Sequence, residues 1–218
     1  DEKDLEMAVY AAMIDRMDQN IGRVLKRLED AGVMDNTLIM YFTDNGACPF
    51  DSNRDYDIPP GPAESYRCQC AAWANVGNTP FRLFKQNGHE GGANTHCIAH
   101  WPDKIKPNQI TDQPAHLVDI FPTYLEMAGV EYPTEYKGKK TLPLAGKSLM
   151  PIFNGKQREE PEFFISGHTE KFRMYRRGNW KIVRENRGPW ELYDLDKDRT
   201  EVKNLATSNP EKLNELVG

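Results

Sequence analysis

Thr43-Asp44-Asn45-Gly46 directly follows the apolar run Leu38-Ile39-Met40-Tyr41-Phe42. A short continuous apolar run is typical of a strand that is buried on both faces of a sheet. In open α/β sheets, ligands bind outside the carboxyl ends of the strands. The sequence therefore predicts an α/β fold, with a ligand site where this strand ends.

A long helix is expected before the strand. Apolar residues recur at steps of three and four from Met7 to Leu28, which is the pattern of an amphipathic helix with one buried stripe. Gly32 supplies a helix stop, and Asp35-Asn36 supplies a turn. Helix, turn and strand together make one α/β unit.

A second α/β unit is expected further along. Residues 98–101 read as a short strand, and residues 114–128 read as a helix that ends at Gly129. Residues 47–63 are rich in Pro, Asp, Asn and Gly and are expected to form a long loop. Residues 47–70 are the candidate for a loop that shapes the substrate pocket. The predicted architecture is thus part of a mixed or parallel sheet flanked by helices.

Beyond about residue 137 the chain changes character. Short aromatic and β-branched segments arrive at hairpin-like intervals, at residues 163–165, 172–175, 180–183 and 190–193. This spacing predicts a small antiparallel sheet. Asn209-Pro210 opens a closing helix that runs to Val217, because proline fits the first helical turn. We expect two domains, residues 1–136 and a small C-terminal α+β subdomain of residues 137–218.

Charge and composition narrow the classes of function. The 218 residues carry 33 acidic and 28 basic side chains, interspersed, for a net charge of -5. This balance argues against a nucleic-acid-binding surface. No apolar run approaches the roughly 20 residues of a membrane span. Because helical periodicity begins almost at once and the first residue is not Met, we expect the chain to start at an internal cut, with a processed mature terminus as the alternative.

The cysteines say little by themselves. Cys48, Cys68, Cys70 and Cys97 are too few for a disulfide framework and are not spaced as a zinc site. One or two disulfides and buried free thiols both remain open.

Asp44 and Asn45 are candidate metal ligands. Their side-chain oxygens are hard donors that suit Ca²⁺ or Mg²⁺, and Gly46 allows the backbone to turn sharply. The tripeptide alone is also an ordinary turn signal, but its position at a strand end favours the metal site. Since Ca²⁺ takes about six to eight oxygen ligands, further carboxylates must come from elsewhere.

A cation is expected to face the same ligand. Lys85 follows an apolar segment that can hold its stem, and it precedes the glycine-rich bend Glu90-Gly91-Gly92. Its ammonium could hold an anion, although most lysines are simply solvated. His89 lies in the same bend and could donate a proton to a leaving group. Arg82 is the competing cation, and His168 could overhang the site; for each histidine the alternative is an ordinary structural or surface role.

In combination these residues resemble the type I sulfatase (arylsulfatase) family of the alkaline phosphatase superfamily. The matching stretches span nearly the whole chain: Asp18 to Gly22, Asn36 to Ile39, Thr43 to Gly46, Trp73-Ala74-Asn75, Asn78 to Phe81, Lys85, Glu90-Gly91-Gly92, Trp101-Pro102, His116 to Ile120, Pro122-Thr123, Gly178 to Lys181 and Glu191 to Leu195.

The resemblance implies a calcium-dependent sulfuric ester hydrolase. It implies that Asp44 and Asn45 bind the active-site Ca²⁺, with Mg²⁺ as the alternative cation, and that Lys85 contacts the sulfate group of the substrate. In the family, a Cys or Ser of a C/S-x-P/A-x-R motif becomes formylglycine, its hydrate attacks sulfur, and a histidine helps to expel sulfate. A sulfated small molecule or carbohydrate is the expected substrate. Periplasmic, secreted or lysosomal placement is expected because the family is often exported.

The nucleophile motif of the family does not surround any of the four cysteines. We therefore expect the chain to be the C-terminal half of a sulfatase, inactive alone, with formylglycine on the missing N-terminal half as its partner. Residues 1–136 would then belong to the catalytic α/β domain. Ala93-Asn94-Thr95-His96 also departs from the Arg-Val-Pro-like sequence that relatives commonly place after the glycines.

Two alternatives remain open. A phosphomonoester or phosphonate hydrolase of the same superfamily would also use a metal and a lysine, because such a site stabilises either oxyanion. A non-catalytic fragment or binding module would keep the fold without turnover.

Overall fold

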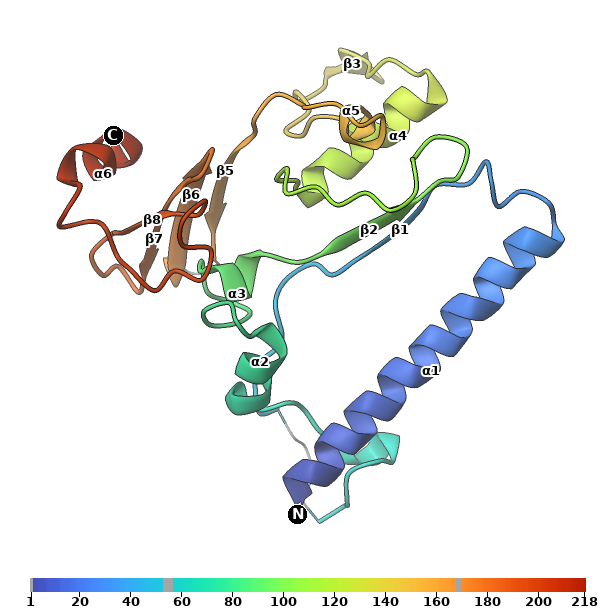
Figure 1. Cartoon of the computed structure of the whole chain (residues 1–218), viewed down its shortest axis with the longest axis horizontal. Helices are drawn as coiled ribbons and strands as arrows, with labels where there is room; N and C mark the ends of the chain where they lie inside the picture. Colours follow the sequence, from blue (N-terminus) through green and yellow to red (C-terminus); the bar gives the residue numbers. More distant parts are fainter. Residues whose placement is uncertain (1, 53–56, 168–169) are drawn as a thin grey trace. The chain divides into compact units, whose positions relative to one another are not determined.

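The computed structural model describes residues 2–52, 57–167 and 170–218 and has a mixed α/β fold (Figure 1). Its described strands form a two-stranded sheet, β1-β2, a second two-stranded sheet, β3-β4, and a four-stranded sheet in the order β5-β6-β7-β8. The predicted fold class, with a small antiparallel sheet and a C-terminal helix after the α/β part, is confirmed.

The described chain divides into two compact units. One contains the described residues of Asp1–Met34, Tyr41–Cys97 and Phe163–Gly218, and the other contains Asp35–Met40 and Ile98–Glu162. This division by contacts differs from the expected domain boundary at residue 136, which stays a prediction.

The first unit holds most of the helices and the larger sheet. Its elements are α1 (Glu2–Asp30), η1 (Ala63–Ser65), α2 (Ala71–Asn78), α3 (Glu90–Ala93), β6 (Phe172–Arg177), β7 (Trp180–Glu185), β8 (Glu191–Asp194) and α6 (Pro210–Val217), with β5 (Glu162–Ser166) entering it at its second residue. The second unit holds η2 (Leu117–Asp119), α4 (Ile120–Ala128), β3 (Glu135–Tyr136), β4 (Lys139–Lys140) and α5 (Met150–Phe153). Strands β1 (Ile39–Phe42) and β2 (Cys97–His100) each carry residues of both units.

Helix α1 confirms the predicted long helix, but the expected buried stripe is wrong. Gly32 ends it at φ 67°, where glycine has no Cβ penalty. Only Glu6 is buried among the described α1 residues, and Met13 is 66% exposed. Periodicity fixes which residues share a helix face. Burial also needs a covering layer, which the described residues do not place over most of this face.

Strand β1 lies where it was predicted, but burial on both faces is wrong. Its Tyr41 is 44% exposed. Within the described part of the chain, β1 pairs with β2 alone. A sheet of two strands leaves more of each face open than a wider, covered sheet does.

The four-stranded sheet contains the best-buried core. Met174 pairs with Val183, and their side chains join Tyr193 in one buried cluster. The preceding residue of β7, Ile182, points to the opposite face, because strand side chains alternate. There α6 covers it through Leu216. The predicted antiparallel sheet and closing helix thus form one packed body.

Helix α4 begins later than the predicted helix at 114–128. The backbone N–H of His116 donates to Asp119 at 2.8 Å, and His116 Nδ1 accepts from the N–H of Val118 at 3.2 Å. This reciprocal cap starts a short 3₁₀ turn, η2, which leads into α4. Gly129 ends α4 at φ 63°, as predicted.

Candidate active site

The loop of Asp44 and Asn45 follows β1 and is held by its backbone. The N–H of Gly46 donates to the carbonyl of Gly92 at 3.1 Å, and the N–H of Ala47 donates to Asn78 Oδ1 at 3.1 Å. A Cβ on Gly46 would lie 1.7 Å from the Gly91 carbonyl oxygen. Glycine is therefore required here for close backbone approach, a reason beyond the sharp turn that the sequence suggested.

Lys85 and the glycine-rich turn that follows it, residues 85–92, form one bend, and this bend is joined to the same loop. The N–H of Lys85 donates to the carbonyl of Ala47 at 3.0 Å. Asn78 adds a second link, since its Nδ2 donates to the carbonyls of Leu83 at 3.0 Å and Gly91 at 2.8 Å. The structure thus brings the backbones of the two predicted site segments together, although about forty residues separate them in sequence.

Asp44 and Asn45 carry oxygen donors that suit a hard cation, but they are fewer than the roughly six to eight ligands that Ca²⁺ takes. Asp44 is exposed, and Asn45 is half-buried with its Nδ2 bonded to the carbonyl of Gly46 at 3.0 Å. That bond does not use the amide oxygen, which is the atom that would coordinate a cation. Across the three described ranges, no group of three or more His, Cys, Asp or Glu side chains is placed to hold a metal ion. Asp44 and Asn45 could supply two ligands of a larger set.

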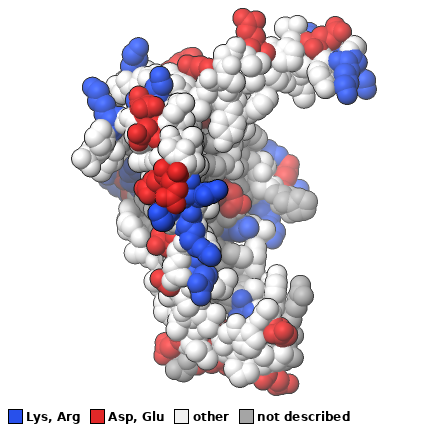
Figure 2. Space-filling model, turned by 90° about the vertical axis from the view of Figure 1, so that its right-hand side faces the viewer, with Lys and Arg blue, Asp and Glu red and all other residues white. Residues whose placement is uncertain are grey.

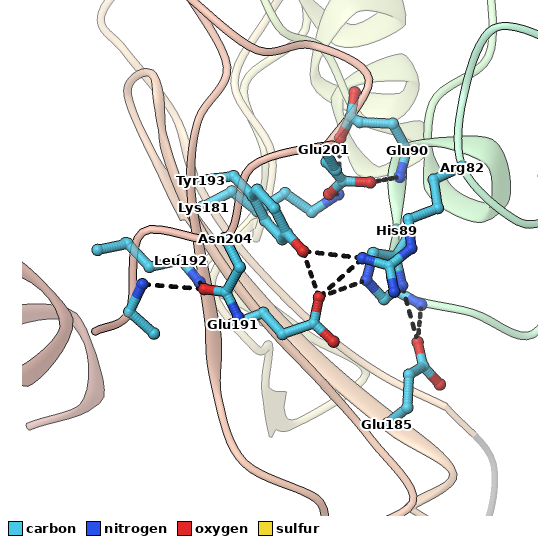
Figure 3. A network of polar contacts seen from close by, with 12 residues as sticks. Arg82, His89, Glu90, Lys181, Glu185, Glu191, Leu192, Tyr193, Glu201 and Asn204 are labelled. Atoms are coloured by element: carbon cyan, nitrogen blue, oxygen red, sulfur yellow. Dashed lines mark hydrogen bonds and ion pairs between the residues drawn. The ribbon is translucent and has the colours of Figure 1, made fainter. Parts of the chain in front are cut away.

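His89 lies in the bend but is fully buried beneath the C-terminal sheet (Figure 3). Its Nε2 lies 3.2 Å from Glu191 Oε2, and its Nδ1 lies 3.3 Å from Glu185 Oε1. The second contact has ion-pair distance without hydrogen-bond alignment. The N–H of Gly88 also donates to Glu185 at 3.0 Å. This placement favours a structural role for His89; its catalytic role stays a prediction.

Arg82, the competing cation, faces the same sheet. Its Nη1 lies 2.9 Å from Glu191 Oε2 and 2.8 Å from Tyr193 Oη, and Tyr193 in turn donates to Glu191. Glu191 and Tyr193 lie two apart on β8, so both side chains project from one face. Sequence reasoning assigned them to a strand and missed this contact, although the alternation was the available signal.

The Glu191 carboxylate gives a pH prediction. Burial acts to raise its pKa, but hydrogen bonds from Tyr193 and His89 and the charge of Arg82 outweigh burial and hold the pKa below the ordinary 4.5. A depressed folded-state pKa adds stability that is present above the ordinary value and is lost as pH falls through the folded-state value. We expect the difference in unfolding free energy between wild type and Glu191→Gln, from urea titrations at several pH values, to shrink as the medium is acidified. A difference that is independent of pH would contradict this account.

A second polar cluster is fully buried beside the first (Figure 3). Lys181 on β7 lies 2.7 Å from Glu90 Oε1 and 2.8 Å from Glu201 Oε1. The exposed fractions of Lys181, Glu90 and Glu201 are 0%, 3% and 1%. The sequence showed Lys181 only as a polar position in a strand and gave no signal for its partners.

The remaining candidates lie elsewhere. His116 caps η2 in the second unit. His168 and residues 53–56 of the candidate substrate loop lie outside the described residues. All four cysteines, each within a described range, are free thiols.

The surface agrees with the mixed charge of the sequence. Figure 2 shows acidic and basic side chains beside one another, with neither sign covering the face in view. Among the described helices, none combines the length and apolarity that a membrane crossing requires.

Comparison with known proteins gives consistent matches. A family model described as Sulfatase matches residues 1–130, and one described as N-sulphoglucosamine sulphohydrolase, C-terminal, matches residues 82–216. An uncharacterized sulfatase of Schizosaccharomyces pombe is 34% identical over 235 residues, covering 97% of this chain and 42% of that protein. An arylsulfatase of Klebsiella aerogenes is 33% identical over 168 residues, covering 70% of this chain and 36% of that protein.

A solved structure shares the fold. It is a protein in complex with its substrate D-glucosamine-2-N,6-O-disulfate, with a TM-score of 0.68 and 24% identity, and the match covers 95% of this chain and 38% of that one. The chain therefore spans well under half the length of the relatives that it matches.

Proposed function

Because this chain belongs to the sulfatase family, we propose that it contributes Asp44, Asn45 and Lys85 to the site of an enzyme that hydrolyses a sulfate ester to an alcohol and inorganic sulfate. The observation that carries the proposal is the pair of backbone hydrogen bonds, Gly46 to Gly92 and Lys85 to Ala47, at 3.1 and 3.0 Å. They join a loop with two hard oxygen donors to a bend with one ammonium.

Each residue has a distinct task in this proposal. The Asp44 carboxylate and the Asn45 amide oxygen would hold Ca²⁺, with Mg²⁺ as the alternative, and the bound cation would supply positive charge to the sulfate oxygens. Lys85 would bring its ammonium to the same anion and stabilise the charge that develops on it. A sulfated carbohydrate or small molecule is the proposed substrate class, and the sulfated glucosamine bound by a protein of the same fold supports it.

The nucleophile is proposed to lie on a segment that carries the C/S-x-P/A-x-R motif, where it would be formylglycine. No cysteine of these 218 residues has that context. The 218 residues alone are accordingly expected to hydrolyse neither aryl sulfates nor aryl phosphates.

The test uses a polypeptide that joins this chain to such a segment. Hydrolysis of 4-nitrophenyl sulfate is expected to exceed that of 4-nitrophenyl phosphate, and Lys85→Met is expected to lower kcat by about a hundredfold, since it removes one donor to the developing charge. Lys26→Met removes an exposed lysine of α1 and serves as the control. A preference for the phosphate ester would instead support the phosphomonoester or phosphonate hydrolase. Equal rates in wild type and Lys85→Met would remove Lys85 from the site.

A further inference from the structure

Three buried charged residues meet at the glycine-rich end of the bend, where Glu90 is one of them. Lys181 comes from β7, Glu90 is the first residue of α3, and Glu201 follows β8. One ammonium thus lies between two carboxylates, at 2.7 and 2.8 Å. We call these three residues the buried triad; Figure 3 shows them converging from separate segments.

The backbone of Glu201 is strained. Its φ is 55°, in the left-handed region that favours glycine. The turn around it is held by Asp198, whose carboxylate accepts from the N–H groups of Val202 at 3.1 Å and Lys203 at 2.7 Å. Glu201 Oε2 then accepts from the backbone N–H of Glu90 at 2.6 Å. A strained residue held this firmly indicates that the position of its carboxylate matters.

Glu90 connects the triad to the proposed site. The next residue, Gly91, donates its N–H to the carbonyl of Arg82 at 2.8 Å and accepts from Asn78 at 2.8 Å. The carbonyl of Gly92 accepts the N–H of Gly46 at 3.1 Å. Only one or two residues therefore separate the triad from the backbone groups that hold the Asp44 loop.

We propose that the buried triad positions the bend that carries Lys85 against the loop of Asp44 and Asn45, so that the C-terminal sheet sets the geometry of the cation and sulfate site. This inference rests on the proposed function. The three are positioning residues, because they act through backbone and not through contact with substrate. A buried ion pair need not add net stability, so the role inferred for the triad is to fix one arrangement of the elements that it joins.

The test compares two substitutions of Glu201, made in the polypeptide that joins the 218-residue chain to a segment with the C/S-x-P/A-x-R motif. Glu201→Ala removes the acceptor for the Glu90 N–H but leaves the Lys181–Glu90 pair, which is neutral overall, so no unpaired buried charge remains. Glu201→Gln removes the same charge and keeps an oxygen acceptor. Ile182→Ala, a neighbouring core residue of β7 on the opposite face, is the control for a general loss of stability.

Two readouts separate positioning from stability. Hydrogen exchange at the amides of Gly46, Lys85 and Gly91 reports the three backbone bonds directly, and calorimetry reports Ca²⁺ affinity. In Glu201→Ala we expect the three amides to exchange about tenfold faster than the general loss of stability, measured with Ile182→Ala, explains. We expect Ca²⁺ to bind about tenfold more weakly than to wild type. Glu201→Gln should stay near wild type in both, and Ile182→Ala should lower protection uniformly.

The outcomes distinguish the two proposals. The inference is overturned when Glu201→Ala changes the three amides no more than Ile182→Ala does. Absence of Ca²⁺ binding by the wild-type joined polypeptide would count against the proposed cation site. The exchange rates would then still decide whether the triad positions the bend.

Discussion

Lys181→Met is expected to lower the free energy of unfolding by about 3 to 5 kcal/mol, the range for removing one partner of a buried ion pair. Lys181 is fully buried between Glu90 and Glu201. Without its ammonium, two carboxylates would face each other away from water. Keeping them charged, or protonating one of them, costs free energy in the folded state, and its stability falls accordingly. Urea unfolding followed by fluorescence measures the change.

Lys197→Met is the matched control for Lys181→Met. Lys197 also pairs with a carboxylate, that of Asp194, at 2.6 Å, but its side chain is 79% exposed. No measurable change is expected there, because water replaces the contact. Equal effects of the two substitutions would contradict the idea that burial, and not the ion pair itself, makes Lys181 important.

Gly46→Ala is the second large effect that we expect. The added Cβ would lie 1.7 Å from the oxygen and 2.9 Å from the carbon of the Gly91 carbonyl. Overpacking costs about 1 to 3 kcal/mol and more when the obstructing atoms are backbone. The loop of Asp44 would have to move away from the bend, so Ca²⁺ affinity should fall together with stability. Thermal unfolding and calorimetry of the joined polypeptide check both.

Gly22→Ala makes the same chemical change in open space. A Cβ at this α1 position meets nothing within 4 Å. Alanine is better than glycine in a helix by about 0.5 to 1 kcal/mol, so this variant should be slightly more stable. A Gly46→Ala protein with wild-type stability and wild-type Ca²⁺ affinity would show that the close approach of the two backbones is dispensable.

Local pattern predicted most elements of the fold. The periodicity of α1, the apolar run of β1 and the hairpin spacing of β6 to β8 each specify their own conformation. Helix α2 was missed, since Ala71–Asn78 is short and lacks a strong apolar period. Burial was predicted less well, as exposed Met13 and Tyr41 show. A pattern states which side chains share a face, and a separate element has to cover that face.

The residues of the candidate site stay a prediction, and the structure shows only part of the contacts among them. Asp44, Asn45 and Lys85 were identified from chemistry and position, and the structure joins their backbones. His89 shows the opposite case. Its place in the bend favoured catalysis, but Glu185 and Glu191, about a hundred residues later, surround its ring.

By itself, the sequence determined which segments become helices and strands, the family to which the chain belongs, and the oxygen and ammonium groups that suit a metal and an anion. Those properties depend on neighbours within a few residues or on recognisable motifs. Only the tertiary structure decided that Gly46 must lack a side chain, that His89 is enclosed, and that Lys181 joins Glu90 to Glu201. Such contacts join residues that are distant in sequence, and their energies depend on burial, which no local pattern encodes.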